Sequence, residues 1–532
     1  MSSCLPVRLP SRAAVTGALC RCDGAHCDQI EPLGTIPDDG FVLYTTSLHD
    51  DTERLSRSTG RFRSPQLKRS ADTFSLSINA SARFQTITGF GGAFTDAAAL
   101  GFKALTPAAR AKLMESYFSE AGLRYSVGRI PIASSDFSTS VYSYNDVQWV
   151  DGSSKIEDLN LTHFSVEMDE ASSKLPMIRA ASAISPSGIR FFGSCWAPPV
   201  WMTQKNSSLN ARLRDQPGGP IHKAYARYLS RFVREYAAKG VKIWALTGGN
   251  EPCATLSGNT GKWQDLEFSA EDQRDFIKTD LGPALEGSGV KLMILDDQRS
   301  HLPHWADTVL ADEAAAKYVD GIGVHWYTAV EDTLDMFPRL LETHSKHPNV
   351  FIMGTEACEG YLPWSQGVYA GDWWRAERYA HDILGDINNF AVGWTDWNLC
   401  LDMSGGPNWA GNECDSPILI DTPNSVTAAP GSVDAFYKQP MYYYLGHIAA
   451  FVAPGSVRIG LETHTPWFSR ALEASAFLSS DGKRIVAVVL NRATSGREFS
   501  LRCASGTGPS IDASIPPSAM QTYVFDMPPD GC

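Results

Sequence analysis

Short apolar runs alternate with longer amphipathic stretches through the middle of the chain. Eight of these runs have the length and composition of buried parallel strands. They are 86–91, 123–132, 189–194, 242–247, 291–295, 321–325, 350–355 and 390–395. The intervals contain helical patterns, such as 224–239, where large apolar residues recur at three- and four-residue spacing. Eight such units predict an α/β fold, a (β/α)8 TIM barrel.

The two flanks of this region have a different pattern. Residues 40–80 and 445–530 contain strand-like runs of alternating polarity, separated by Gly, Pro and Ser. The clearest runs are 41–45, 73–78, 471–478, 484–490 and 521–525. This pattern is typical of a β-sandwich. Because the flanks bracket the barrel, we expect them to pair into one discontinuous β-domain.

The composition indicates an ordinary folded protein. Of the 532 residues, 43% are hydrophobic and 20% charged, which argues against disorder. The net charge of −13 and the lack of long Lys/Arg runs make nucleic acid an unexpected partner. No stretch approaches 18 uninterrupted apolar residues, so we expect no transmembrane segment.

Cysteines crowd the beginning of the chain. Four of the eleven fall in the first 27 residues, namely Cys4, Cys20, Cys22 and Cys27. A segment this small needs covalent staples, so two disulfides are the favoured interpretation. The C-x-C-x4-C spacing leaves metal binding as the alternative, disfavoured because no distal ligand pair matches it.

Three N-x-[ST] triplets begin at Asn79, Asn160 and Asn206. With the cysteine cluster they favour a lysosomal or extracellular protein, although no signal peptide is visible. Cys503 and Cys532 lie in the predicted β-domain as a further candidate pair.

Two glutamates follow the fourth and seventh apolar runs. Glu251 stands in Gly-Gly-Asn-Glu-Pro and Glu356 in Glu-Ala-Cys-Glu-Gly. Catalytic groups of a TIM barrel lie at the carboxyl ends of its strands. An isolated glutamate more often forms a salt bridge or caps a helix, but a pair at one barrel mouth fits glycoside hydrolysis. Asn250, next to Glu251, suits a sugar 2-hydroxyl.

Other strand ends carry groups that suit a sugar pocket. Aromatic rings stack on pyranose C–H faces, while carboxylates and amides bind hydroxyls. A lone tryptophan is more often a core residue, but aromatics end three separate runs. The candidates at these ends are Arg129, Asp136, Trp196, Tyr327 and Trp394.

Other motifs give weaker indications. His301 and His304, after Asp296 and Asp297, could form a metal site, but Pro303 disfavours a shared helical face. Two solvated histidines are the favoured interpretation. The glycines at 89–93 lack phosphate-binding spacing, and no G-x-S-x-G or H-E-x-x-H motif occurs. We therefore expect no metal and no organic cofactor.

Motifs along nearly the whole chain resemble the glucosylceramidases (acid β-glucosidases) of glycoside hydrolase family 30. The matching segments include GFGGAFTDAAAL at 89–100, RIPIASSDFS at 129–138, FGSCWAPPVWM at 192–202, NEP at 250–252, TEACEG at 355–360, VGWTDWNL at 392–399 and GGPNW at 405–409. So many ordered matches are far more specific than one motif.

The resemblance implies a retaining mechanism, with Glu251 as acid/base and Glu356 as nucleophile. We expect burial and mutual repulsion to raise the pKa of one carboxyl group, Glu251, and the charge of Arg129 to hold down that of Glu356. Arg129 and Tyr327 would orient Glu356. The implied sugar contacts are Asp136, Trp196, Asn250, Trp394 and Asn408. It also implies that the four N-terminal cysteines pair within a small β segment.

The resemblance and the patterns together predict three parts. These are a small disulfide-bearing part from 1–35 with an insertion at about 400–428, a β-sandwich from 36–84 and 446–532, and a barrel from 85–399 and 429–445. The family's usual Ala-Glu before Asn-Glu-Pro is Gly248-Gly249 here. Cys253, Cys400 and Cys414 have no obvious counterpart, and a Cys400–Cys414 pair is one alternative to free thiols.

The implied substrate is glucosylceramide at a membrane surface, with a saposin-like activator and anionic lipid as further partners. Relatives that cleave β-1,6-glucan or xylan leave an extracellular polysaccharide hydrolase as an alternative. A non-catalytic carbohydrate-binding barrel is the third interpretation, disfavoured because both glutamates are present.

Overall fold

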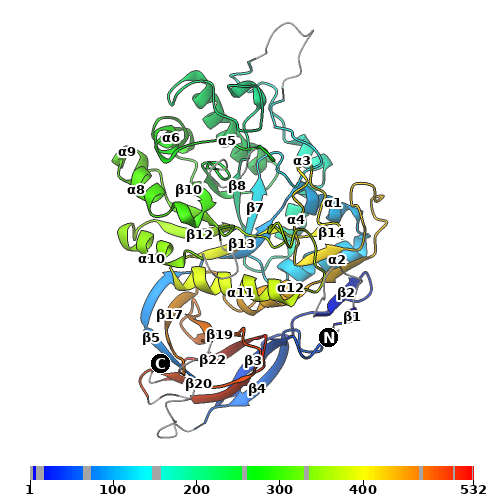
Figure 1. Cartoon of the computed structure of the whole chain (residues 1–532), viewed down its shortest axis with the longest axis vertical. Coiled ribbons are helices and arrows are strands. Elements are labelled where there is room, and N and C mark those ends of the chain that lie inside the picture. The colour runs from blue at the N-terminus through cyan, green and yellow to red at the C-terminus, as the bar shows by residue number, and fades with distance from the viewer. Residues whose placement is uncertain are drawn as a thin grey trace.

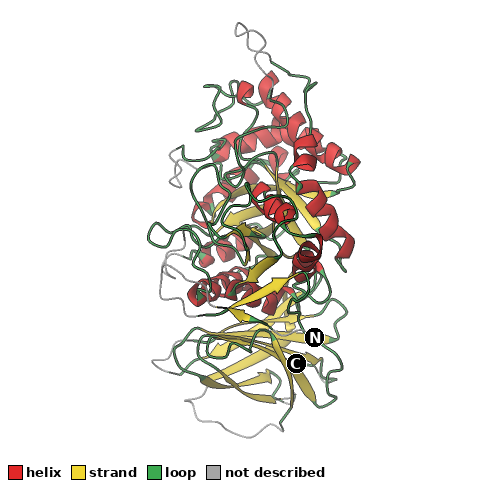
Figure 2. Cartoon of the chain, turned by 90° about the vertical axis from the view of Figure 1, so that its right-hand side faces the viewer, coloured by secondary structure: helices red, strands yellow, loops and turns green. Residues whose placement is uncertain are grey.

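A computed structural model describes residues 4–7, 17–63, 74–146, 157–253, 261–328, 335–466, 471–506, 508, 510–529 and 531–532 of the chain. Helices surround a parallel barrel in one part, and strands gather in a second part at the other end of the molecule (Figure 1). Figure 2 shows this separation from the side, with both termini close to the strand-rich end.

Eight parallel strands form the barrel sheet in the order β12-β11-β10-β9-β8-β7-β6-β13. They are β6 (Gly89–Ala93), β7 (Val127–Pro131), β8 (Arg190–Ser194), β9 (Ile243–Thr247), β10 (Lys291–Gln298), β11 (Gly321–His325), β12 (Phe351–Glu356) and β13 (Gly393–Asn398). A parallel bridge between Ile352 and Ala391 joins the two ends of the sheet. Each strand overlaps one of the eight predicted runs, so the predicted TIM barrel is confirmed.

Helices cover the outside of this barrel (Figure 1). They are α1 (Asp96–Ala104), α2 (Pro107–Phe118), α3 (Glu167–Ala171), α4 (Lys174–Ile184), α5 (Pro220–Ala238), α6 (Ala270–Phe276), α7 (Gly282–Leu285), α8 (His304–Leu310), α9 (Glu313–Ala316), α10 (Phe337–Lys346), α11 (Trp373–Asn388) and α12 (Pro440–Ala449). In α5, Tyr225, Leu229, Phe232 and Tyr236 are fully buried, as the helical spacing predicts. Among the described helices, none has the length and apolar character needed to cross a bilayer.

Buried apolar side chains fill the interior of the barrel. Val127, Phe192, Ala245, Met293 and Met353, one from each of five strands, form a cluster there. Side chains point alternately inward and outward along a strand. Arg129, two residues beyond Val127, therefore faces the same interior at the carboxyl end of β7.

The second part is a nine-stranded sheet in the order β21-β20-β5-β17-β18-β19-β22-β3-β4. Its strands are β3 (Gly40–Ser47), β4 (Ser56–Arg61), β5 (Phe74–Thr86), β17 (Val457–His464), β18 (Glu473–Leu478), β19 (Arg484–Asn491), β20 (Arg497–Cys503), β21 (Ser510–Ile515) and β22 (Ala519–Asp526). N-terminal β3 and β5 pair with C-terminal β22 and β17, so the two flanks form one sheet, as predicted. A disulfide joins Cys503 and Cys532.

The N-terminal segment belongs to a third, small sheet in the order β1-β2-β16-β15-β14. Its strands are β1 (Pro6–Val7), β2 (Leu19–Asp23), β14 (Leu401–Asp402), β15 (Ile418–Ile420) and β16 (Ala435–Lys438). Residues 435–438 fall in the range that we assigned to the barrel, yet they pair with β2. The other domain boundaries stay predictions.

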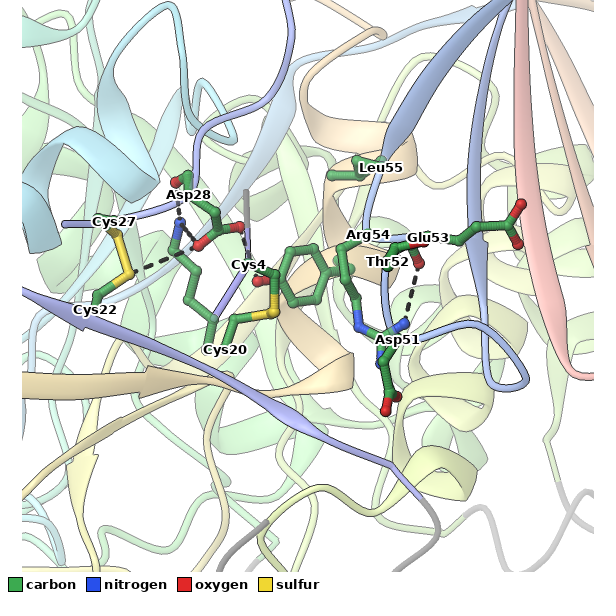
Figure 3. The surroundings of a disulfide bond; sticks show 12 residues. Cys4, Cys20, Cys22, Cys27, Asp28, Asp51, Thr52, Glu53, Arg54 and Leu55 are labelled. Atoms are coloured by element: carbon green, nitrogen blue, oxygen red, sulfur yellow. Dashed lines mark hydrogen bonds and ion pairs between the residues drawn. A yellow bond between two sulfur atoms is a disulfide. The ribbon is translucent and has the colours of Figure 1, made fainter. Parts of the chain in front are cut away.

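Two disulfides join Cys4 to Cys20 and Cys22 to Cys27 (Figure 3). Beside them Asp28 forms an ion pair with Lys438, in which Oδ1 of Asp28 lies 3.1 Å from Nζ of Lys438. The segment is therefore attached to the rest of the chain by strand pairing and by a buried charge, and its thiols are used in covalent bridges rather than as metal ligands.

Candidate active site

Glu356 is the last residue of β12 and lies at the carboxyl end of the barrel. Its carboxylate is paired with the guanidinium of Arg129, from β7, and its Oε1 accepts a hydrogen bond of 2.8 Å from the hydroxyl of Tyr327. Glu356 is 7% exposed and Arg129 is fully buried. The barrel thus brings these three predicted residues together around one carboxylate.

Asp296, on β10, is a central residue of the site that the sequence analysis did not select. Its Oδ2 accepts hydrogen bonds from Arg129 (3.0 Å) and Ser194 (2.5 Å), and its Oδ1 lies 3.0 Å from Nε2 of His325. The position at the end of the fifth strand was the available signal, but Asp296 had been considered only as part of a metal motif.

Glu251 follows β9 and faces Glu356 across the barrel mouth. Its Oε1 lies 3.0 Å from Nδ1 of His325 and accepts a 3.0 Å hydrogen bond from Gln298. Carboxylate oxygens of Glu251 and Glu356 and a nitrogen of His325 all lie within 4.8 Å of one another. Two carboxyl groups this close can act on the two sides of one glycosidic bond.

The backbone before Glu251 takes a conformation that glycine permits. Gly249 has φ of 142°, and Glu251 itself has φ of 44°, a left-handed value that non-glycine residues rarely adopt. A Cβ added at Gly249 would meet only the carbonyl oxygen of Cys195, at 3.9 Å. The departure from the family's Ala-Glu therefore leaves open space beside the candidate acid/base.

Burial and neighbouring charges have opposite effects on the pKa values of Glu356 and His325. Burial raises the pKa of Glu356 above its ordinary value, although Arg129 and then His325 pull it down. Arg129 therefore lowers this pKa, as expected, but desolvation outweighs the ion pair and the net shift is upward. Burial lowers the pKa of His325, but the surrounding carboxylates outweigh burial and raise it to about 10.

Asp136 lies in the loop after β7 and faces the same mouth. Its Oδ2 accepts a 2.8 Å hydrogen bond from Asn412, while its buried Oδ1 has no partner among the described residues. Burial, followed by the charge of Glu356, raises the pKa of Asp136 to about 7. An unpartnered carboxylate oxygen in this position can accept a hydrogen bond from a ligand hydroxyl.

Trp196, after β8, stacks on Trp397 with ring centroids 4.9 Å apart and an interplanar angle of 13°. The guanidinium of Arg129 lies 4.9 Å from the Trp196 ring and 5.3 Å from the Trp397 ring. The predicted Trp394 instead points toward α11, where its indole donates to Asp382 at 2.8 Å. Trp394 is therefore a wrong choice, and Trp397, three residues on and facing the interior, takes its place.

The remaining predicted residues have different surroundings. Asn250 accepts a 2.7 Å hydrogen bond from Arg129, which fixes it beside Glu251. Asn408 is half-buried, and its Oδ1 accepts from the backbone of Ala410 at 2.8 Å. Its buried Nδ2 has no partner among the described residues, so it is available to a ligand. Asn412, which contacts Asp136, was not predicted.

His301 and His304, the alternative metal ligands of the sequence analysis, do not share one site. His304 is exposed, whereas His301 lies near Cys253 and Asp297, with one ligand atom of each within 4.8 Å of the others. These last three residues have the atom types of a transition-metal site. The Cys400–Cys414 pair is also wrong, because Cys400 lies against the carbonyl of Ala98 and Cys414 against Cys358.

A separate groove of about 590 Å³ lies near the opposite end of the barrel. Its lining includes Lys291, Phe351 and Val392, at or just before the amino ends of barrel strands, together with Phe84 of β5. It is therefore remote from the two glutamates. The active sites of TIM barrels lie at the carboxyl ends of the strands, so this groove is not the candidate active site.

Comparisons with known proteins agree on the architecture and the chemistry. Residues 87–452 match the Glycosyl hydrolase family 30 TIM-barrel domain, and residues 455–523 match the family's beta sandwich domain. The chain is 40% identical to the lysosomal acid glucosylceramidase of Mus musculus over 97% of this chain and 95% of the relative. It is 28% identical to an endo-1,6-beta-D-glucanase of Neurospora crassa, over 82% and 86% of the two chains. A solved endo-beta1,6-glucanase superposes with a TM-score of 0.76 at 26% identity, covering 92% of this chain and 100% of that one.

Proposed function

We propose, from the premise that the chain belongs to glycosyl hydrolase family 30, that it is a retaining β-glucosidase that hydrolyses glucosylceramide. The observation that carries the chemistry is the pair Glu251 and Glu356, at the ends of β9 and β12, with oxygens within 4.8 Å of each other. Retaining glycosidases hold their carboxyl groups about 5–5.5 Å apart, whereas inverting enzymes need about 6.5–9.5 Å to admit a water molecule.

Glu356 is the proposed nucleophile. Its ion pair with Arg129 and its hydrogen bond from Tyr327 fix the carboxylate and stabilise its charge. In the first step an oxygen of Glu356 attacks the anomeric carbon, and a covalent glycosyl-enzyme forms as the bond to the aglycone breaks.

Glu251 is the proposed general acid and base. Among the residues that the structure describes, its carboxylate lies beside His325 and Gln298. In the proposed first step Glu251 donates a proton to the departing oxygen. Glu251 then removes a proton from the water that releases glucose.

The glucose unit is proposed to bind between the loops after β7, β8 and β13. Asp136 offers its unpartnered Oδ1, and Asn250 offers its amide beside the glutamates. The stacked Trp196 and Trp397 provide an aromatic wall. Asn408 offers its Nδ2 from the loop over the mouth.

The substrate is assigned from the relatives and from apolar surface at the mouth. The mouse relative is named a glucosylceramidase. Trp364, in the loop after β12, is 60% exposed, and Val200, after β8, is 38% exposed. Such side chains favour an aglycone presented at a lipid surface. Anionic lipid and a saposin-like activator are the partners that this proposal includes.

A lysosomal or extracellular location is part of the same proposal. Three disulfides indicate folding in an oxidising compartment. The name of the mouse relative specifies a lysosomal enzyme, and burial raises the pKa of Asp136 and Glu359 to about 7. Because the folded state binds these two protons more tightly than the unfolded state, both groups increase the free energy of unfolding as the pH falls below 7.

The second candidate substrate is β-1,6-glucan, favoured by the Neurospora relative and by the solved glucanase. The test is turnover of glucosylceramide in anionic vesicles, measured beside turnover of β-1,6-glucan. We expect glucose release from the lipid; release from glucan alone would replace the proposed substrate. A 2-deoxy-2-fluoroglucoside inactivator should label Glu356, and a label on any other residue would contradict the mechanism.

A further inference from the structure

Two thiols outside the three disulfides lie side by side at the barrel mouth. The Sγ atoms of Cys358 and Cys414 are 2.8 Å apart, and the residues are 1% and 4% exposed. The optimal separation of two non-bonded carbon atoms is about 3.5–4.0 Å, so the two sulfurs are closer than an ordinary packing contact. A disulfide requires about 2.05 Å, so the two sulfurs need to approach by less than about 1 Å.

The backbone holds these two cysteines in register. The amide of Asp415 donates to the carbonyl of Glu359 at 2.8 Å, one residue beyond each cysteine. A Cβ added at Gly360 would lie 2.8 Å from the Asp415 nitrogen, so the two segments run in close contact. The closeness of the sulfurs therefore follows from main-chain packing and not from a chance rotamer.

Two of the three other free thiols, Cys195 and Cys400, differ clearly from this pair. Cys195 donates to the carbonyl of Ala197 at 3.3 Å, and Cys400 to that of Ala98 at 3.6 Å. Both are fully buried. Neither has a sulfur among its described hydrogen-bond partners, so they serve as matched controls.

We propose that Cys358 and Cys414 are a disulfide-forming site that a low-molecular-weight disulfide such as oxidised glutathione closes. One thiol loses a proton and attacks the small disulfide, which releases one glutathione thiol and leaves a mixed disulfide. The second cysteine loses its proton, attacks the first cysteine's sulfur and releases the second glutathione. The two cysteines lose two electrons and two protons, and the glutathione disulfide gains them.

Burial decides when this exchange proceeds. It raises the pKa of the Cys358 thiol well above the ordinary value, and the thiolate is the reactive form. The exchange is therefore fast while the loop at 405–414 is still open during folding, and slow once the loop has closed. The bond forms in the same oxidising surroundings as the other three disulfides.

The bond would connect the nucleophile strand to the loop that supports Asp136. Cys358 stands two residues after Glu356, and its sulfur accepts a 3.5 Å hydrogen bond from Tyr327, which also donates to Glu356. Cys414 stands two residues after Asn412, whose amide binds Asp136. Closing the disulfide fixes the loop in its ligand-binding position, and preordered loops bind ligands more tightly. This effect on catalysis rests on the proposed function, but bond formation does not.

The test is peptide mapping of the full chain, folded in a glutathione buffer and alkylated without reduction. Cleavage before aspartate gives peptide 335–371, with Cys358, and peptide 402–414, with Cys414; Cys400 falls in the separate peptide 396–401. We expect 335–371 and 402–414 to be linked. Alkylation of both cysteines in protein with its other three disulfides intact, or a link from either peptide to 396–401, would overturn the proposal.

Two variants separate the bond from a packing effect. Cys414→Val should abolish the link and make the melting temperature and the KM insensitive to the glutathione ratio. Cys400→Val should retain both responses. In the parent chain we expect the oxidised form to melt a few degrees higher, with a KM for an aryl glucoside lower by about two- to tenfold. Because the link is read by mass, an inactive chain would refute the proposed function and leave this inference intact.

Discussion

Two buried arginines of the barrel have nearly the same surroundings. Arg129 pairs with Asp296 and Glu356 and lies 4.9 Å from the Trp196 ring. Arg299 pairs with two aspartates at 2.6 and 2.5 Å and lies 4.8 Å from the Phe337 ring. Both guanidiniums are fully buried. Buried charge, an aromatic neighbour and two carboxylates therefore do not distinguish an active site from a structural ion cluster.

The difference lies in what surrounds each cluster. The partners of Arg299 are Asp382 and Asp386, one turn apart on α11, and the Trp394 indole binds Asp382. The Arg129 cluster continues to a second glutamate, and its backbone is left-handed at Glu251 (φ 44°) and Asp296 (φ 57°). Strained residues at strand ends, beside a carboxylate with room for a ligand, indicate function, because strain of this kind costs about 1–3 kcal/mol per residue.

The largest expected effect belongs to the carboxylate that Arg129 holds. Glu356→Gln should lower kcat for an aryl β-glucoside by at least about 10⁴-fold, since no covalent intermediate can form. The melting temperature should change little because the amide keeps the shape. Activity close to that of the parent chain would remove Glu356 from its role.

Glu251→Ala should lower kcat/KM by about 10²–10⁴-fold for an aglycone that needs protonation. The loss should be much smaller for a dinitrophenyl glucoside, which leaves without a proton. Added azide should restore turnover and give a glucosyl azide of retained configuration. An equal loss for both substrates would show that Glu251 is not the acid.

Replacing each of the two arginines by methionine, in separate variants, distinguishes the structural cluster from the active site. Arg299→Met should cost about 3–5 kcal/mol of unfolding free energy, because two buried carboxylates lose their cation. Its kcat, measured below the melting transition, should stay within about twofold. Arg129→Met should lower kcat/KM by at least about 100-fold, and a small effect would make its cluster structural too.

The smallest effect is on the pH dependence of stability. The pKa of His325 rises from 6.5 to about 10 on folding, so its stabilisation is complete below pH 6.5 and is lost as the pH rises through 10. His325→Gln should therefore flatten the decline in unfolding free energy between those values, by up to a few kcal/mol. Denaturant unfolding at pH 6 and pH 9.5 measures this change.

His447 provides the matched control, because burial lowers its pKa to about 3. Its unfolded form binds a proton below pH 6.5 while the folded form does not, so stability falls as the pH drops from 6.5 to 3. His447→Gln should relieve that acid decline and leave the alkaline one unchanged. The reverse result would mean that the two histidines have been assigned the wrong environments.

Much of the architecture could be predicted because each barrel strand is an apolar run with turn residues beside it. Two strands of the nine-stranded sheet that were not predicted, β4 and β17, are polar or mixed. β4 reads SRSTGR and β17 reads VRIGLETH, and both join the sheet through pairing with distant strands. Such pairing depends on the fold and leaves little local pattern.

At the site, Glu251, Glu356 and Arg129 could be located because they lie in or just after the carboxyl-terminal parts of β9, β12 and β7. The choice between Trp394 and Trp397 could not be made in this way. Alternation places Trp394 and Trp397 on opposite faces of β13, but both are tryptophans, so the sequence does not show which of them faces the interior. A register shift at Leu295 turns Asp296 toward Arg129.

The nine-stranded sheet also determines the order in which the molecule can be completed. β3 and β5 leave the ribosome before the barrel, but their partners β22 and β17 follow it. At about 5–20 residues per second, synthesis of the intervening barrel takes on the order of tens of seconds. During that time the first strands present unpaired edges, which other chains can occupy. The sheet can therefore be completed only after β22, its last strand in the sequence, has been made.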